Sequence, residues 1–330
     1  MSLINFSNTL SLKSGGFFNK EICDIFISFQ HKISLPKNFL IICDKGTEYI
    51  AQNFTQNYYV ISTILDLQRQ VENFDGIFAI GSGTVNDFAK FASFKAGKPF
   101  ITYATALSMN GYLSSTASLL DEKGQKVSIS CHLPQALYFD LEILHNAPIE
   151  LTKAGFGDAM ARASAQSDCL LSHKYKDTNY NEDLFKLRLP SEEFLLQNHL
   201  KLTQQDDEFI LELLENTLFT GFAMHVFGSS FVASGGEHAM AHFASQNFTC
   251  VQKFLHGLQV AAFTCEMLKI QKAFKEERSF NYRSFDIEKI FHDLKIPNKF
   301  EDLGLTKEEF ALTLKGAKVL RDRYGFLNLI

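Results

Sequence analysis

The sequence predicts an α/β domain with a Rossmann-like parallel sheet, followed by an all-helical domain. In the first half, short apolar runs alternate with helical patterns, which is the arrangement of parallel βαβ units. Beyond Pro148, clear strand patterns end and helical periodicity dominates. We therefore expect domains at 1–148 and 149–330, with a ligand-binding cleft between them.

Five short apolar runs bounded by turn residues predict the strands of the first domain. They lie at 39–43, 76–80, 99–103, 127–130 and 136–140. Apolar residues at 85, 88, 89 and 92 share one helix face, so a helix is expected over 85–96. Gly97 follows as the residue that ends this helix.

The second domain is expected to be helical, with two excursions over the surface. The stretches 174–207 and 281–301 are rich in polar and charged residues, which is typical of surface segments. Lys153 and Arg162 lie within five residues of Asp158. Each is either a solvated helix charge or a contact for a phosphate.

The composition argues against several classes of protein. The chain has 330 residues, of which 46% are hydrophobic, so a substantial core is expected. The formal charge of −5 gives no electrostatic case for nucleic acid. No apolar run reaches the roughly 18 residues of a membrane helix. The six cysteines form no C-x-x-C pair and the N-terminus shows no signal-peptide pattern, so a cytoplasmic protein with reduced cysteines is expected.

A glycine-rich turn follows the second predicted strand. Gly81 and Gly83, with Ser82 between them, allow tight backbone geometry, and the helix that follows turns its N–H groups towards any bound phosphate. The same residues also suit a tight turn without a ligand. Asp87 either compensates the helix dipole or lies near a dinucleotide, and Asp44 either contacts a ribose hydroxyl or is an ordinary turn aspartate.

A loop rich in small hydroxyl residues follows the third predicted strand. It contains Thr105, Ser108 and Asn110. Loops at the carboxyl ends of parallel strands face the ligand crevice of an α/β sheet. By composition alone, this segment is either an ordinary loop or part of a binding site.

Asp158, His238 and His256 form a candidate metal site. One carboxylate and two imidazoles suit a divalent ion that keeps an open position for substrate. Taken singly, such an aspartate is usually a helix cap and such a histidine an ordinary core or surface residue. His242 lies one helical turn after His238, as a further ligand or as a base near the metal. The order Glu-His-x-x-x-His is not that of a zincin.

Taken in order, these motifs resemble the superfamily of iron-type alcohol dehydrogenases and dehydroquinate synthases, and most of all its sn-glycerol-1-phosphate dehydrogenases. The similarity is spread over nearly the whole chain. The motifs that carry it lie at 76–90, 97–100, 105–108, 138–141, 147–148, 154–158, 233–243, 256–260 and 321–324. Within the first motif, Ser82 stands where the family's loop has its middle glycine, and Thr84 stands where it has serine.

The resemblance implies a dehydroquinate synthase-like fold and reversible reduction of dihydroxyacetone phosphate by NADH or NADPH. It implies that Asp158, His238 and His256 hold zinc, nickel or iron, with zinc the first choice. It implies that the dinucleotide lies near the residues of the glycine-rich turn and the hydroxyl-rich loop. These residues are Gly81, Ser82, Gly83, Asp87, Thr105 and Ser108. His242 is the candidate proton relay. A homodimer is expected.

Asn110 departs from the family pattern, because the family's loop carries aspartate at this position. Asparagine has the same shape but no charge, so it cannot act as a base. Besides reduction of a phosphorylated ketone, three alternatives stay open. They are an unphosphorylated polyol as substrate, a lyase reaction of the dehydroquinate synthase type, and a non-catalytic nucleotide-binding relative.

Overall fold

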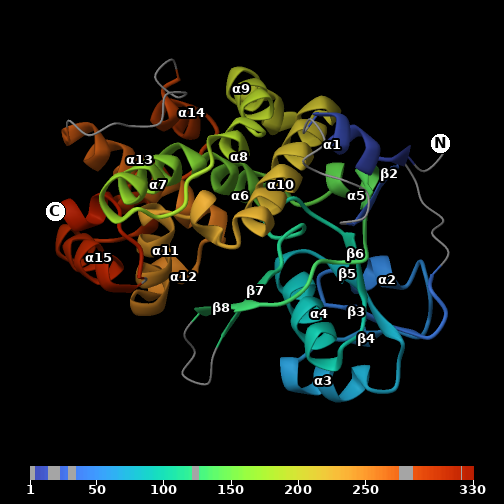
Figure 1. Ribbon diagram of the computed structural model, residues 1–330. Helices are drawn as coiled ribbons and strands as arrows, with labels where there is room; N and C mark the ends of the chain where they lie inside the picture. Colours follow the sequence, from blue (N-terminus) through green and yellow to red (C-terminus); the bar gives the residue numbers. More distant parts are fainter. Residues whose placement is uncertain (1–3, 14–22, 29–34, 121–125, 275–284, 321) are drawn as a thin grey trace. The chain divides into compact units, whose positions relative to one another are not determined.

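The computed structural model describes residues 4–13, 23–28, 35–120, 126–274, 285–320 and 322–330 (Figure 1). Residues 281–284 of the predicted surface stretch and Arg321 of the C-terminal motif lie outside these ranges. The chain divides into two compact units, Met1–Pro148 and Ile149–Ile330. Each unit is described by itself.

The first unit is built on a seven-stranded sheet with the order β1-β2-β9-β6-β5-β3-β4. Its strands are β1 (Ile4–Asn5), β2 (Asp24–Ser28), β3 (Phe39–Cys43), β4 (Tyr59–Val60), β5 (Gly76–Gly81), β6 (Phe100–Ala104) and β9 (Ala136–Asp140). Only β1 runs antiparallel to its neighbour β2, and the other pairs are parallel. The predicted parallel α/β sheet is confirmed.

Both faces of this sheet are buried, which explains the continuous apolar runs of its central strands. Successive side chains of a strand point to opposite faces. In β3, Leu40 and Ile42 belong to the cluster that includes α3 (Ile64–Val71) and α4 (Gly83–Ala96). Ile41 and Cys43 belong to the opposite cluster with α2 (Glu48–Ala51). Helices α1 (Ser7–Lys13) and α5 (Leu141–His145) complete the described helices of this unit.

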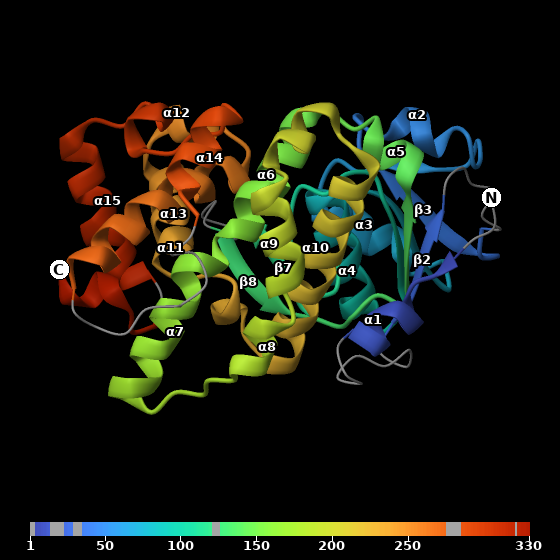
Figure 2. The same ribbon diagram turned by 90° about the horizontal axis from the view of Figure 1, so that it is seen from above.

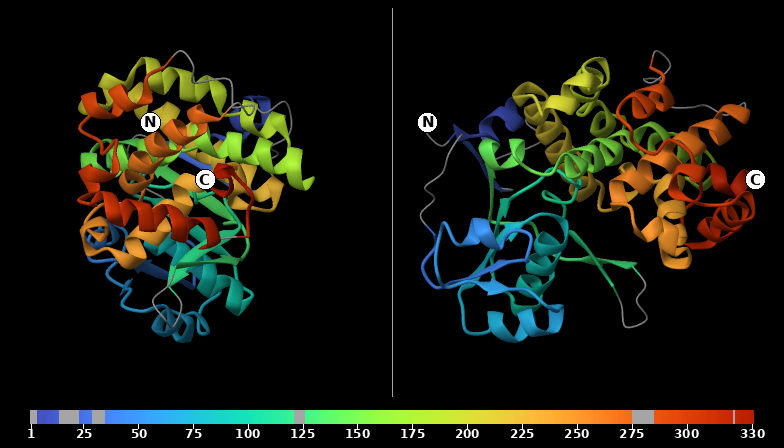
Figure 3. Two further views of the ribbon diagram at one scale, coloured as in Figure 1. Left: turned by 90° about the vertical axis from the view of Figure 1, so that its left-hand side faces the viewer. Right: turned by 180° about the vertical axis from the view of Figure 1, so that it is seen from behind.

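One predicted strand lies outside this sheet. Lys126–Ser130 forms β8, which pairs antiparallel with β7 (Thr116–Leu120) in a separate two-stranded hairpin. Figure 3 shows this hairpin extending from the sheet. The side chains of β8 alternate between exposed and half-buried, so the strand has no face buried in the core of the sheet. The strand predicted at 127–130 is therefore present in the first unit, but it belongs to this hairpin and not to the main sheet.

The second unit is helical, and it contains no strand among its described residues. Its helices are α6 (Ile149–Met160), α7 (Arg162–Lys176), α8 (Glu182–Lys186), α9 (Leu189–Gln197), α10 (Asp207–Phe227), α11 (Gly236–Asn247), α12 (Thr249–Gln252), α13 (His256–Ala273), α14 (Ile287–Asp293) and α15 (Lys307–Leu320). Four 3-10 turns accompany them, namely η1 (His199–Gln204), η2 (Ser230–Val232), η3 (Phe300–Leu303) and η4 (Phe326–Leu329). Helices α11, α13 and α15 pack side by side (Figure 2).

The described residues of the two predicted surface segments are largely helical and partly buried. In α9, Glu192 is 1% exposed because it pairs with the equally buried Arg162 of α7. In α14, Ile287 and Phe291 are buried. The polar composition misled the prediction, because a charge can be buried when another element supplies its partner. No helix in the described part of the chain is long and apolar enough to cross a membrane.

Candidate functional site

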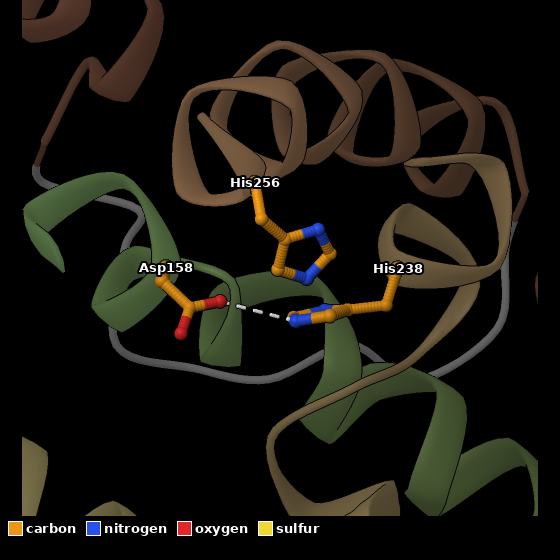
Figure 4. Close-up of side chains that lie close together, drawn as sticks. All are labelled: Asp158, His238 and His256. Carbon is orange, nitrogen blue, oxygen red and sulfur yellow. Dashed lines mark hydrogen bonds and ion pairs between the residues drawn. The ribbon is translucent and has the colours of Figure 1, made fainter. Parts of the chain in front are cut away.

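Asp158, His238 and His256 gather within the second unit (Figure 4). Asp158 lies in the last turn of α6, His238 in the first turn of α11, and His256 is the first residue of α13. One ligand atom from each residue lies within 4.8 Å of the other two. His238 Nε2 is 3.1 Å from Asp158 Oδ1, and the His238 and His256 rings are 5.4 Å apart between centroids.

Two glycines let α6 and α13 approach closely enough to bring Asp158 and His256 together. A Cβ atom on Gly257 would lie 1.9 Å from the carbonyl oxygen of Ala154, and one on Gly157 would lie 2.5 Å from the carbonyl oxygen of Gly257. No side chain fits between these backbones. Gly157 directly precedes Asp158, and Gly257 directly follows His256. The close crossing of the helices therefore places the two candidate ligand residues side by side.

Glu237 orients the imidazole of His238. Its Oε1 lies 2.8 Å from His238 Nδ1 and also accepts a hydrogen bond of 2.6 Å from the Gly235 N–H. Its Oε2 accepts one of 2.5 Å from the Ser164 hydroxyl. Burial would raise the pKa of Glu237, but its hydrogen bonds with His238 and Ser164 hold that pKa below the usual value. An ionised carboxylate only accepts, so Nδ1 carries the hydrogen and Nε2 faces Asp158.

The arrangement fits a divalent cation. Burial would lower the pKa of His238, but the hydrogen bonds with Asp158 and Glu237 raise it. The facing Nε2 and Asp158 Oδ1 atoms need a proton or a cation between them, because their lone pairs repel. A carboxylate that holds the far nitrogen of a ligating histidine is the usual support in metal sites. Three protein ligands also leave a position for substrate.

His242 lies beside these residues but is not one of the three. Its ring is 5.1 Å from the His256 ring and 6.4 Å from the His238 ring, between centroids. It is 8% exposed. This position places a titratable group next to the candidate metal site, one turn along α11 from His238.

In the first unit, the glycine-rich turn joins β5 to α4. Gly81 ends β5, and a Cβ atom there would lie 2.5 Å from the Val85 side chain, so glycine is required by packing. Ser82 precedes the helix, and Gly83 is its first residue. The carbonyl of Gly81 accepts a hydrogen bond from the Thr105 N–H, 3.2 Å away. The turn and the hydroxyl-rich loop are therefore neighbours at the carboxyl ends of β5 and β6.

Asp87 faces protein groups in the structure. Its Oδ2 accepts a hydrogen bond of 3.0 Å from the Ser118 N–H, and its Oδ1 is 3.6 Å from Lys90 Nζ. Burial raises the pKa of Asp87 and lowers that of Lys90. Lys90 also donates to the carbonyls of Gly111 and Thr116, at 2.9 and 3.0 Å. The Asp87–Lys90 pair was not predicted, and Lys90 holds both ends of the segment that follows Asn110.

The remaining candidates of the first unit differ in their surroundings. Asp44 Oδ1 accepts hydrogen bonds from the Thr47 N–H at 2.9 Å and the Thr47 hydroxyl at 3.0 Å, which is the geometry of a turn aspartate. Asn110 is 6% exposed. Ser108 is half-buried.

The structure does not support the two expectations for Arg162. Its side chain is 1% exposed and pairs with Glu192, so it is neither a solvated charge nor open to a phosphate. Lys153 forms an ion pair of 3.0 Å with Glu150. The Lys153 pair joins residues one turn apart on α6, whereas the Arg162 pair joins residues 30 positions apart in the chain.

The sequence is similar to proteins that match it over nearly its full length. A family profile described as iron-containing alcohol dehydrogenase matches residues 40–148. A glycerol-1-phosphate dehydrogenase [NAD(P)+] of Pyrococcus furiosus is 30% identical over 326 residues, which cover 94% of this chain and 91% of the relative. The chain belongs to the family of this relative, the glycerol-1-phosphate dehydrogenases. A second relative of the same name, from Thermococcus kodakarensis, is 28% identical over 320 residues, covering 92% of this chain and 88% of the relative.

Solved structures of low sequence identity share the fold. A probable glycerol dehydrogenase from Sinorhizobium meliloti has a TM-score of 0.70 at 17% identity, covering 89% of this chain and 86% of that chain. An iron-containing alcohol dehydrogenase has a TM-score of 0.64 at 14% identity, covering 93% and 96%. The resemblance stated from the sequence motifs is confirmed, and so is the fold class.

Proposed function

We propose that this oxidoreductase uses a divalent metal and NAD(P)H to reduce dihydroxyacetone phosphate, or a similar phosphorylated ketone, to sn-glycerol 1-phosphate. The observation that carries the proposal is the buried group of Asp158, His238 and His256 with Glu237 behind it. The names of the relatives supply the substrate class.

In this proposal Asp158, His238 and His256 hold the metal, with zinc as the first choice and nickel or iron as alternatives. When bound, such an ion acts as a Lewis acid that polarises the carbonyl of the substrate. Glu237 and Ser164 keep the His238 ring in the orientation that points Nε2 into the site. The Gly157–Gly257 crossing keeps Asp158 and His256 in place.

The dinucleotide is proposed to bind at the turn of Gly81, Ser82 and Gly83 and at Thr105 and Ser108. The first N–H groups of α4 suit a phosphate, because the amino end of a helix carries partial positive charge. Asp44 at the end of β3 favours NAD over NADP, since a carboxylate repels a 2′-phosphate. Asp87 is proposed to support this region through Lys90 and Ser118. A homodimer in the cytoplasm completes the proposal.

Two further residues have proposed roles near the reacting atoms. His242, one turn after His238, is proposed to relay a proton to the carbonyl oxygen as hydride arrives, because an imidazole takes up a proton at one ring nitrogen and releases one from the other. Asn110 is proposed to donate and accept hydrogen bonds and to take no part as a base, because its amide does not titrate.

The test follows the absorbance of reduced nicotinamide with zinc-loaded protein and a panel of phosphorylated and unphosphorylated ketones. We expect oxidation of NADH or NADPH with dihydroxyacetone phosphate, and its loss on treatment with a chelator. Asp158→Ala should reduce turnover by at least about a thousandfold, because the loss of one such electrostatic contribution costs several kcal/mol. The matched control is Glu308→Ala, which removes an exposed carboxylate of the same unit.

Each other outcome contradicts the proposal in a different way. Turnover only with unphosphorylated ketones would indicate an unphosphorylated polyol dehydrogenase. Product formation without net change of the nicotinamide would indicate a lyase. Bound nucleotide and metal without turnover of any substrate would indicate a non-catalytic relative.

A further inference from the structure

The carboxylate of Asp168 joins two segments that are remote in sequence. Asp168 lies in α7 and is 2% exposed. Its Oδ2 accepts a hydrogen bond of 2.7 Å from the N–H of Gly236, the first residue of α11. Its Oδ1 accepts one of 2.9 Å from the N–H of Phe326, near the carboxyl end of the chain. One buried side chain therefore ties the C-terminal segment to the start of α11.

Two glycines enclose this carboxylate. A Cβ atom on Gly235 would lie 2.6 Å from Asp168 Oδ2, and one on Gly325 would lie 2.9 Å from both Asp168 Cγ and Oδ1. The φ angle of Gly325 is −166°, which any residue adopts. Glycine is therefore needed at 325 for space and not for backbone freedom.

Arg323 attaches the same C-terminal segment to the residues just before α11. Its Nη1 donates to the carbonyl of Ser234 at 2.8 Å, and its Nη2 donates to the Ser230 hydroxyl at 3.0 Å. Its guanidinium lies 5.1 Å from the centre of the Phe231 ring. The turn that begins α11 is thus held at Ser234 by Arg323 and at Gly236 by Asp168.

This turn leads directly into the candidate metal site. Glu237 and His238 are the second and third residues of α11, and the Gly235 N–H donates to Glu237 Oε1. A shift of the Gly235–Gly236 backbone moves the Glu237 carboxylate and, through it, the His238 ring. Metal ligands must be held to within about 0.5 Å of their productive positions.

We propose that Asp168 is a positioning residue, which holds the first turn of α11 against the C-terminal segment and so sets His238 for the metal. The inference rests on the metal site of the proposed function. Asp168 touches neither metal nor substrate in this role, and acts through the Gly236 backbone and Glu237.

The test measures zinc affinity of the full chain by competition with a chromophoric chelator, at a temperature where every variant is folded by circular dichroism. Asp168→Asn keeps the shape but presents an amide N–H₂ to one of the two N–H donors. In Gly325→Ala, Asp168 itself is kept, but the new Cβ pushes against its Cγ and Oδ1 atoms and displaces the carboxylate. The control is Glu266→Gln, which makes the same kind of change at another carboxylate of the second unit, 8% exposed on α13.

We expect zinc affinity to fall about tenfold or more in Asp168→Asn and in Gly325→Ala, and to stay at the wild-type value in Glu266→Gln. If both variants are folded, have lower melting temperatures and bind zinc as the wild type does, Asp168 is only structural and the proposal is overturned. If Asp168→Asn does not fold, Gly325→Ala alone decides. His238→Asn separates the two proposals, because wild-type affinity in that variant would overturn the metal site itself.

Discussion

Replacing Gly257 by alanine tests how the structure brings the ligand residues together. The new Cβ would lie 1.9 Å from the carbonyl oxygen of Ala154, about 1.5 Å closer than an ordinary contact of about 3.4 Å. The clash is with backbone, so no side-chain rotation relieves it and α6 and α13 must separate. Overpacking of this kind costs about 1–3 kcal/mol. Alanine gains at most about 1 kcal/mol in helix propensity, and less in the first turn of α13, so the free energy of unfolding should fall.

The separation of the helices also moves His256 relative to Asp158, because Gly257 directly follows His256 and Ala154 lies one helical turn before Asp158. We expect at least tenfold weaker zinc binding, in line with the effect of disturbed supporting contacts. The assays are urea unfolding and zinc competition, with Gly83→Ala as the control. Gly83 also lies in the first turn of a helix, but its Cβ would meet nothing closer than Met109 Cγ at 3.7 Å. Wild-type stability and zinc affinity in Gly257→Ala would refute the role assigned to the helix crossing.

Two further predictions concern buried charges of the second unit. Glu192→Gln should lower the free energy of unfolding by about 3–5 kcal/mol, because it leaves Arg162 buried without its counter-charge. The double variant Arg162→Met with Glu192→Leu removes both charges and should lower it far less. Urea unfolding measures both changes, and equal losses would contradict this reasoning. Burial, and then the charge of Glu237, raise the pKa of Asp168 from 3.8 to about 7. Between these two pH values, the folded chain keeps a proton on Asp168 that the unfolded chain has lost. The free energy of unfolding of chelator-treated wild type, relative to Asp168→Asn, should therefore fall as the pH rises from about 4 to about 7, and a pH-independent difference would contradict this.

The elements with strong local patterns were predicted well. The runs 39–43 and 136–140 became β3 and β9 with the same bounds, and Gly97 ends α4 with a φ of 64°. Burial on both faces of a parallel sheet produces an apolar run that needs no partner to be recognised. β7 and β2 were missed, and the two-residue strands β1 and β4 are too short to carry a pattern.

The polar stretch 174–207 could not be predicted correctly from local sequence patterns. Its charges predict a surface segment, but the partner that buries Glu192 is Arg162, which lies 30 residues away in the chain. The candidate site has the same limit. Asp168 reaches Gly236 over 68 residues and Phe326 over 158, and neither spacing leaves a periodic signal in the sequence.

The sequence by itself determined the parallel α/β sheet, the family, and the residue types that suit a metal, because these depend on short patterns along the chain. Only the tertiary structure decided that Asp158, His238 and His256 meet and that Glu237 orients His238. It also turned Asp87 towards Lys90 and buried Arg162 against Glu192. The physical reason is that a side chain's role follows from the atoms within a few ångströms of it. For Asp158, His256 and Arg162, the deciding atoms belong to helices that are remote in sequence.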